Sequence, residues 1–182
     1  MRNRKGLTLI ELLAAIVILG ILAVFAIPVI AKLLDNSRNK MYISDAKKFI
    51  SQTEYKLRVN NSNIELPDPS ECIVISLSYL DSSIFDNTPN DGEYSKDKSF
   101  VVVKNIGNDK FEYSVKLVEK YKGNFHKGVD LVKESTLNSN EAMNYVKSFD
   151  SSDLITIDNV TASYINGKIG SNYANNIVSR HK

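Results

Sequence analysis

Residues 1–31 read MRNRKGLTLIELLAAIVILGILAVFAIPVIA and contain a long apolar run with a single carboxylate, Glu11, near its start. The segment from Leu12 to Ala31 carries no charge. As a helix, these twenty residues span about 30 Å, the thickness of the hydrocarbon core of a bilayer. The segment therefore predicts a membrane-spanning helix.

Three basic residues stand before this run. Arg2, Arg4 and Lys5 precede it, and no basic residue lies within it. Positive charge favours the cytoplasmic side of a membrane. We therefore expect a single-pass protein of the cytoplasmic membrane, with a cytoplasmic N-terminus and with everything after Lys32 facing outward.

Two simpler interpretations of the run remain open. A secretory signal has a shorter apolar region and a small-residue cleavage site, for which Val24 and Ala26 could serve. A plain single-span anchor is the other alternative. Glu11 disfavours both, because a central charge in a membrane helix costs about 2.5–3.5 kcal/mol on insertion scales.

Residues 5–12, KGLTLIEL, resemble the N-terminus of type IV prepilins and related pseudopilins. In that family a short basic leader ends in Gly and is followed by an apolar residue, Thr or Ser, two aliphatic residues, Glu and a hydrophobic helix. The resemblance implies a leader of residues 1–6, cleavage between Gly6 and Leu7 by a prepilin peptidase, and methylation of the new amino group on Leu7. Leu7 stands where Phe is usual, a change that this peptidase generally tolerates.

Glu11 is the expected assembly residue. A carboxylate packed among apolar helices without water requires a cationic partner. The resemblance implies that this partner is the free amino group of Leu7 on a neighbouring subunit. Because an unpaired buried charge costs more than the pair contributes, we expect Glu11 to set the register between subunits.

Gly20 and Pro28 interrupt the good helix formers of the run. Pro removes a backbone donor, and Gly lowers helix propensity by about 1 kcal/mol. In the relatives, the corresponding stretch is thought to lose helical hydrogen bonds in the filament. We expect helix flexibility here, and an ordinary membrane-helix kink is the alternative.

The helix should continue through residues 32–59 as an amphipathic segment. Apolar or small residues recur at helical spacing, namely Leu34, Tyr42, Ala46, Phe49 or Ile50, Thr53 and Leu57. Residues 60–63, Asn-Asn-Ser-Asn, favour turns and should end the helix. The remainder, residues 60–182, is expected to form a globular head.

The middle of the head predicts an antiparallel meander over residues 100–133. Residues 111–118 alternate as in a strand with one buried face, and residues 100–103 and 125–132 flank it across turns. Gly128 suggests a bulge in the third strand. A long helix packed on an antiparallel sheet of three or more strands is an α+β fold, and it is also the type IV pilin fold that the resemblance implies.

The two remaining parts of the head are less regular. Residues 60–99 form a long connection with an apolar core from Cys72 to Leu80, and connections of this length usually carry short elements or function. The C-terminal region, residues 134–182, suggests a short helix at 141–149 and strand-like pieces at 154–157 and 160–165. In pilins these two regions form subunit contacts and exposed surface.

The sequence contains little catalytic or metal-binding chemistry. The acidic stretch at residues 86–97 has oxygen ligands suited to calcium, but an EF-hand alignment places Pro89 at a ligand position, so a solvated loop is expected. His126 and His181 lie far apart, and Cys72 in its apolar run reads as a buried thiol that has no partner for a disulfide. We expect no enzyme activity, no cofactor and no metal.

Net charge limits the partners. The chain has 23 basic and 21 acidic residues, and loss of the leader leaves 20 and 21. No strongly basic face suited to nucleic acid is visible. The expected partners are the prepilin peptidase and methyltransferase, identical or related pilin subunits, the assembly platform with its ATPase, and membrane lipid before assembly.

The sequence therefore predicts a structural subunit of a type IV pilus, which polymerises into an extracellular filament at the cell surface. A minor pilin or a type II secretion-like pseudopilin is the alternative within the class. A more distant alternative is a single-span, membrane-tethered binding domain that does not polymerise. Adhesion, twitching motility, aggregation and DNA uptake are the roles that such filaments serve.

Overall fold

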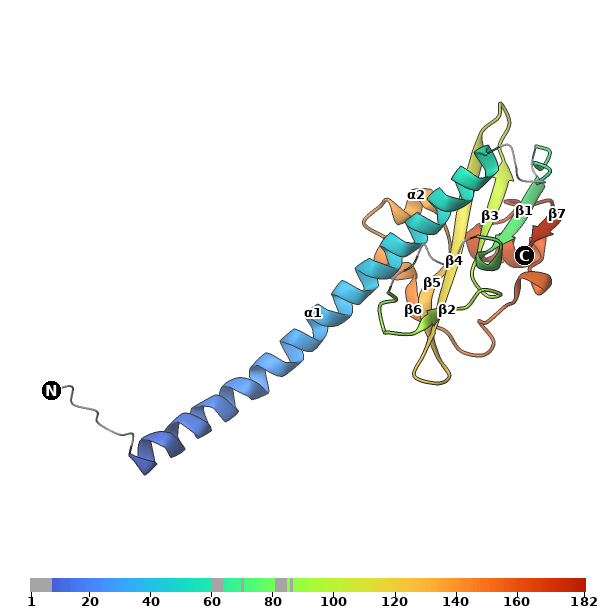
Figure 1. Ribbon diagram of the computed structural model, residues 1–182. Helices are drawn as coiled ribbons and strands as arrows, with labels where there is room; N and C mark the ends of the chain where they lie inside the picture. Colours follow the sequence, from blue (N-terminus) through green and yellow to red (C-terminus); the bar gives the residue numbers. More distant parts are fainter. Residues whose placement is uncertain (1–7, 60–63, 70, 81–84, 86) are drawn as a thin grey trace. The chain divides into compact units, whose positions relative to one another are not determined.

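The computed structural model of the chain describes residues 8–59, 64–69, 71–80, 85 and 87–182. Contacts divide the chain into two units, residues 1–37 and 38–182. Helix α1 (Leu9–Arg58) has 50 residues and belongs to both units (Figure 1). One uninterrupted helix was the prediction, and the structure confirms it. The predicted stop at residues 60–63 lies outside the described residues.

A seven-stranded sheet forms the centre of the second unit. Its strands are β1 (Glu71–Ser76), β2 (Glu93–Tyr94), β3 (Phe100–Asn105), β4 (Phe111–Tyr121), β5 (Phe125–Lys133), β6 (Val146–Ser148) and β7 (Asn176–His181). The order is β6-β5-β4-β3-β1-β7, and β2 pairs with β4 (Figure 1). All pairs are antiparallel except β1 with β7, which is parallel. The fold is therefore α+β as predicted, with a mixed and mostly antiparallel sheet.

The predicted meander is present as β3, β4 and β5. The bulge expected at Gly128 is not there, because Gly128 pairs in register with Val118. The register instead shifts between Val115 and Leu117, opposite Asp130 and Leu131, so the irregularity does lie in the third strand, beyond Gly128. Gly128 has a different role, since a Cβ at this position would come within 2.0 Å of the carbonyl oxygen of Leu117.

One face of the sheet packs on the C-terminal half of α1. The predicted helix positions Tyr42, Ala46, Phe49, Ile50 and Thr53 are buried, Leu57 is partly buried, and Leu34 is exposed. The buried helix residues pack against alternate residues of the strands, including Ile73, Ile75, Val101, Val103, Val115 and Leu117. Burial of each such side chain contributes about 1.5–3 kcal/mol, so this layer fixes the helix to the head.

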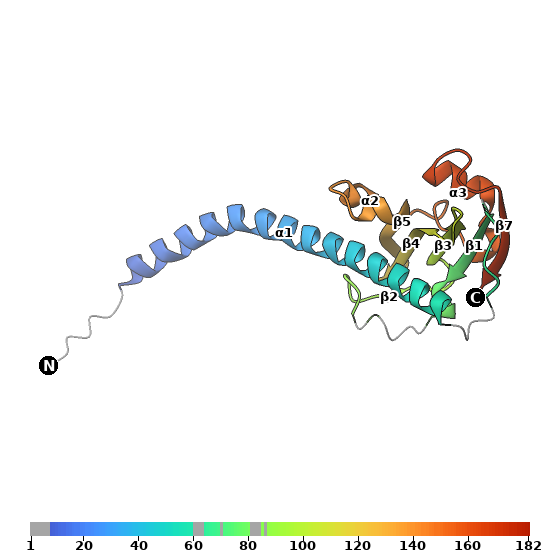
Figure 2. The ribbon, with the colours of Figure 1, turned by 90° about the horizontal axis from the view of Figure 1, so that it is seen from above.

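The C-terminal region covers the opposite face of the sheet (Figure 2). The intervening strand residues Cys72, Val74, Phe100, Val102 and Leu131 pack there against Ile157, Val160, Ile165, Tyr173 and Ala174. The prediction of one buried face for residues 111–118 was wrong, because even Ser114 and Lys116 are fully buried. A sheet covered on both faces explains the unbroken apolar runs in β1 and β3.

Several expectations for the less regular regions are corrected. Residues 141–149 form a short 3₁₀ helix, η3 (Ala142–Tyr145), followed by β6. The strand-like pieces are instead η4 (Ile157–Asn159) and helix α3 (Ala162–Ile169). The Thr161 hydroxyl caps α3 by accepting from the Tyr164 N–H at 3.1 Å. The elements η1 (Leu77–Tyr79) and α2 (Glu134–Leu137) complete the described head.

Candidate assembly segment

The N-terminal part of α1 exposes nearly all of its apolar side chains. Large hydrophobic residues from Leu9 to Leu34 are more than half exposed, and Leu9 reaches 83%. No residue of its most apolar 18-residue stretch is buried. This distinguishes it from the core helix of a water-soluble protein, whose apolar face is covered. The segment needs lipid or other helices around it.

Glu11 closes a capping box at the start of this helix. The backbone N–H and the hydroxyl of Thr8 both donate to Glu11 Oε2 at 2.8 Å, and Thr8 Oγ1 accepts from the Glu11 N–H at 3.4 Å. In a capping box, Ser or Thr precedes the helix and Glu stands three residues later, so that each side chain satisfies an unpaired backbone donor. Thr8 and Glu11 hold these positions, because α1 begins at Leu9.

The capping box was not anticipated, although its signal was present. Thr8-Leu9-Ile10-Glu11 followed by an apolar run is the sequence pattern of this motif. Our interpretation of Glu11 gave it a partner on another subunit and did not consider one within the chain. The structure adds an intrachain role, and both residues would remain in the chain after cleavage at Gly6.

The other predicted residues are placed as follows. Gly6 and Leu7 lie outside the described residues. Pro28 lies inside α1, which is assigned as helix without a break. A Cβ at Gly20 would meet no atom within 4 Å, so no contact among the described residues requires a glycine there. The structure brings Gly20 and Pro28 into no common site.

A buried carboxylate, Glu119 on β4, ties α1 to the loop before β2. It accepts from the backbone N–H groups of Asn90 and Gly92 at 3.0 and 3.1 Å, from the Asn90 amide at 3.0 Å, and from the Tyr42 hydroxyl. Burial and the neighbouring Glu119 hold the pKa of Tyr42 far above its ordinary value. Tyr42 therefore remains a donor, and the loop is organised around a protein carboxylate.

This loop includes most of the stretch considered for calcium. Asp86 lies outside the described residues, and the side chains of Asp91 and Glu93 are exposed. Among the residues that the structure describes, no three His, Cys, Asp or Glu side chains are grouped closely enough to hold a metal ion. A second contact, from the Tyr94 hydroxyl to Asp45 Oδ2 at 2.6 Å, again joins this region to α1.

A second ionic cluster is centred on Asp130. Lys116 Nζ lies 2.7 Å from Asp130 Oδ1, and Lys168 and Lys147 lie 2.9 and 3.0 Å from Asp130 Oδ2. The fully buried Lys116 also lies over the Phe149 ring, 4.3 Å from its centroid. Burial alone would raise the pKa of Asp130, but the three ammonium groups outweigh it and hold this pKa well below its usual value.

The remaining reactive side chains do not converge. His126 is on β5 and His181 is on β7, and these two strands are separated by four strand spacings, or about 19 Å. Cys72 is a free and fully buried thiol. Burial raises its pKa to about 11, so the thiolate that would react is scarce at neutral pH.

Residues 1–27 match the family described as "Prokaryotic N-terminal methylation motif". No curated protein and no solved structure matches the chain. The motif supports a type IV pilin-like or pseudopilin precursor, implies processing by a prepilin peptidase and assembly into a pilus, and indicates a structural subunit. The single long apolar helix fits a membrane-anchored precursor. The N-terminus of this chain therefore carries the type IV prepilin-like leader motif.

Proposed function

We propose that this chain is the structural subunit of a type IV pilus or of a closely related filament. The observation that carries the proposal is the exposed apolar part of α1, which has one carboxylate near its start and begins shortly after the Gly6-Leu7 pair. A precursor with this helix is stable in lipid. Removed from lipid, the same apolar surface is covered only if helices of several subunits pack together.

The proposed sequence of events begins in the cytoplasmic membrane. A prepilin peptidase cuts between Gly6 and Leu7 on the cytoplasmic side, and the Leu7 amino group is methylated. An ATPase-driven platform then extracts the subunits, whose helices form the core of the filament and whose heads form its outer surface. The chain acts as a building block and carries out no enzymatic reaction.

Glu11 would pair with the Leu7 amino group of a neighbouring subunit. The described contacts of Glu11 with Thr8 engage Oε2. A carboxylate offers about four acceptor positions, so Oε1 can accept from a second donor while the capping box stays intact. The capping box thus fixes the orientation of the carboxylate before the neighbour arrives. This arrangement supports a role in register.

The test is Glu11→Leu in cells, with Glu11→Gln as the isosteric variant. We expect both variants to reach the membrane fraction and to be absent from filaments sheared from the cell surface. Normal filaments built from Glu11→Leu would contradict the proposal and favour a tether that does not polymerise. The intact mass of the mature chain independently shows whether it begins at a methylated Leu7.

A further inference from the structure

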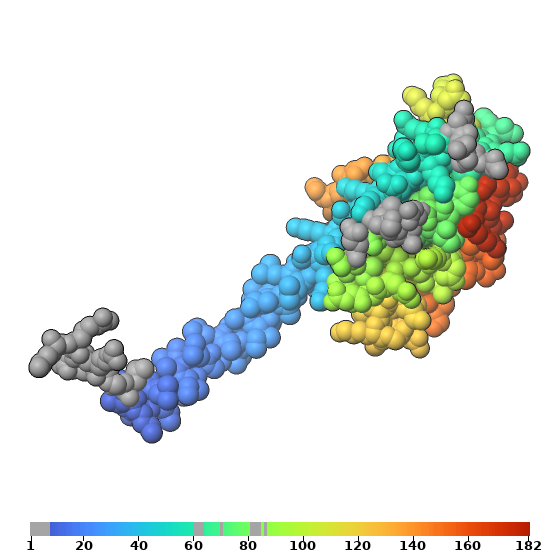
Figure 3. Space-filling view, in the orientation of Figure 1, coloured from blue at the N-terminus to red at the C-terminus, as the bar shows by residue number. Residues whose placement is uncertain are grey.

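The β4–β5 hairpin carries two neighbouring aromatic rings at a tight turn, one exposed and one half-buried. We call residues 120–127 the hairpin tip. The rings of Tyr121 and Phe125 lie 6.1 Å apart, and Phe125 is 64% exposed. Lys122 and Gly123 have positive φ values of 43° and 85°, which close the turn between the strands. The hairpin, yellow to orange in Figure 3, stands at the surface of the head.

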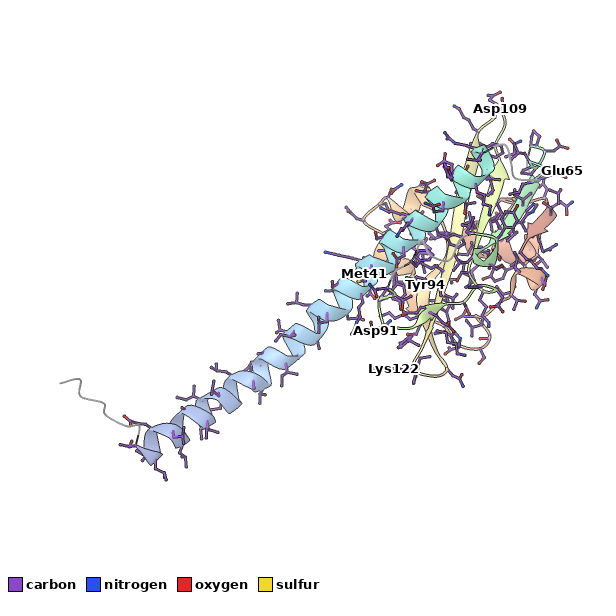
Figure 4. All side chains as sticks on the ribbon, in the orientation of Figure 1. Met41, Glu65, Asp91, Tyr94, Asp109 and Lys122 are labelled. Atoms are coloured by element: carbon purple, nitrogen blue, oxygen red, sulfur yellow. The ribbon has the colours of Figure 1, made fainter. Side chains whose placement is uncertain are left out.

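The hairpin tip lies at the end of the head where the head part of α1 begins. Tyr42, early in the head part of α1, contacts Glu119 at the end of β4. Glu54 and Arg58, at the end of α1, line a cavity with residues 109–111 and Tyr113, where β4 begins. The helix is therefore antiparallel to β4. Figure 4 shows Lys122 at one end of the sheet and Asp109, on the other hairpin, at the opposite end.

Chain connectivity keeps this end of the head near the membrane whenever α1 is inserted. The apolar run ends at Lys32, and the ten residues from there to Tyr42 can span at most about 36 Å in any conformation. The tether makes contact between head and lipid an intramolecular event, so that a weak affinity is sufficient. This limit does not depend on the angle between the helix and the head.

The composition of the hairpin tip suits an anionic interface. Lys120, Lys122 and Lys127 accompany the aromatic pair and His126, and the three-residue turn carries no carboxylate. Exposed acidic residues on neighbouring strands and loops include Asp91, Asp150 and Glu93, and Glu93 is the β2 partner of Lys120. Aromatic rings at the headgroup level and lysines near anionic lipid both favour binding to a membrane surface.

We propose that the hairpin tip docks on an anionic lipid surface beside the chain's own inserted helix. This inference rests on the membrane-anchored precursor of the proposed function and adds a second, reversible contact. Leaving the membrane would then require this contact to break. The opposite hairpin, with Asn108 and Asp109 at its turn, lacks the aromatic pair and serves as the internal control.

The test uses the full chain in vesicles with a nitroxide quencher on the lipid headgroup. An environment-sensitive dye is attached at Asn124→Cys in the hairpin tip or at Lys110→Cys in the opposite hairpin; the buried Cys72 stays unlabelled. Vesicles contain either phosphatidylcholine alone or an equal mixture with phosphatidylglycerol. We expect quenching at position 124 to be at least about twofold stronger in the anionic vesicles, and to weaken in high salt.

Substitutions make the test specific. Lys122→Glu combined with Phe125→Ser should abolish the difference between the two vesicles at position 124. The matched control Lys110→Glu should leave that difference unchanged. Both Lys122 and Phe125 are exposed, so the pair can be replaced without disturbing the core.

The outcomes separate this inference from the proposed function. Flotation with both kinds of vesicle shows that the helix inserts. Equal quenching at positions 124 and 110, or no dependence on lipid charge in a chain that floats, would overturn the docking and leave the proposed function intact. Quenching that depends on protein density and not on lipid charge would indicate contact with a second copy and would also overturn it. A chain that does not float would remove the membrane anchor on which both depend.

Discussion

At the scale of single residues, we expect removal of the Glu119 side chain to destabilise the head most. Glu119→Leu would leave the Asn90 backbone N–H and the Tyr42 hydroxyl without an acceptor, whereas the Gly92 N–H still donates to Thr88 Oγ1 at 2.8 Å and the Asn90 amide to the Tyr42 oxygen at 2.6 Å. We expect the free energy of unfolding to fall by at least about 2 kcal/mol, because each buried donor without an acceptor costs about 1–3 kcal/mol. Urea unfolding in detergent, followed through the tyrosines, measures the loss.

Two further variants serve as controls for this prediction. Glu119→Gln keeps one acceptor and should lose less stability than Glu119→Leu. Glu93→Gln, at an exposed side chain of β2, should change the stability by less than about 0.5 kcal/mol. Equal stability of Glu119→Leu and the unsubstituted chain would show that the loop before β2 does not depend on this carboxylate.

At the scale of elements, the start of α1 allows the two roles of Glu11 to be separated. Thr8→Ala removes the capping box and leaves the Glu11 charge in place. Loss of an N-cap costs about 1 kcal/mol and frays the first turn. We expect Thr8→Ala to reduce the yield of sheared filaments only partly, and Thr8→Ser to restore it, whereas Glu11→Leu abolishes filaments. If Thr8→Ala is as severe as Glu11→Leu, Glu11 acts mainly as a helix cap.

At the scale of the whole head, Asp130 joins β4, β6 and α3 through three lysines. Its folded-state pKa lies below the unfolded value of about 4, so its contribution is fully present above that pH and is lost as the pH falls through the folded value. We expect Asp130→Asn to destabilise the head by about 3 kcal/mol at pH 7. The difference from the unsubstituted chain should shrink steadily between pH 5 and pH 2.

Comparison with the unsubstituted chain is necessary because other carboxylates act in the opposite direction. Burial raises the pKa of Asp45, and burial also raises that of Glu134. Their contributions cancel in the difference between the two proteins. A difference that stays constant with pH would show that Asp130 stabilises the head through packing rather than through its charge.

Local sequence patterns determined the long helix and the β3–β5 meander. Helical spacing from Tyr42 to Leu57 defines the buried stripe of α1, and short turns join strands that pair with their neighbours in sequence. The leader motif is local as well, because its residues are contiguous. The same local pattern, Thr8 to Glu11, contained the capping box that our interpretation missed. Such features depend on residues within a few positions of one another, so a sequence shows them directly.

Only the tertiary structure decided the remainder of the head. It placed β1 in the interior of the sheet between β3 and β7, a pairing that joins residues about a hundred positions apart. It covered the second face with α3 and η4, which is why Lys116 is buried and needs Asp130. The segment at residues 160–165 looked like a strand because its apolar residues fit either period. Its actual form depends on the face of the sheet that it covers, and that face is assembled from strands far away in the chain.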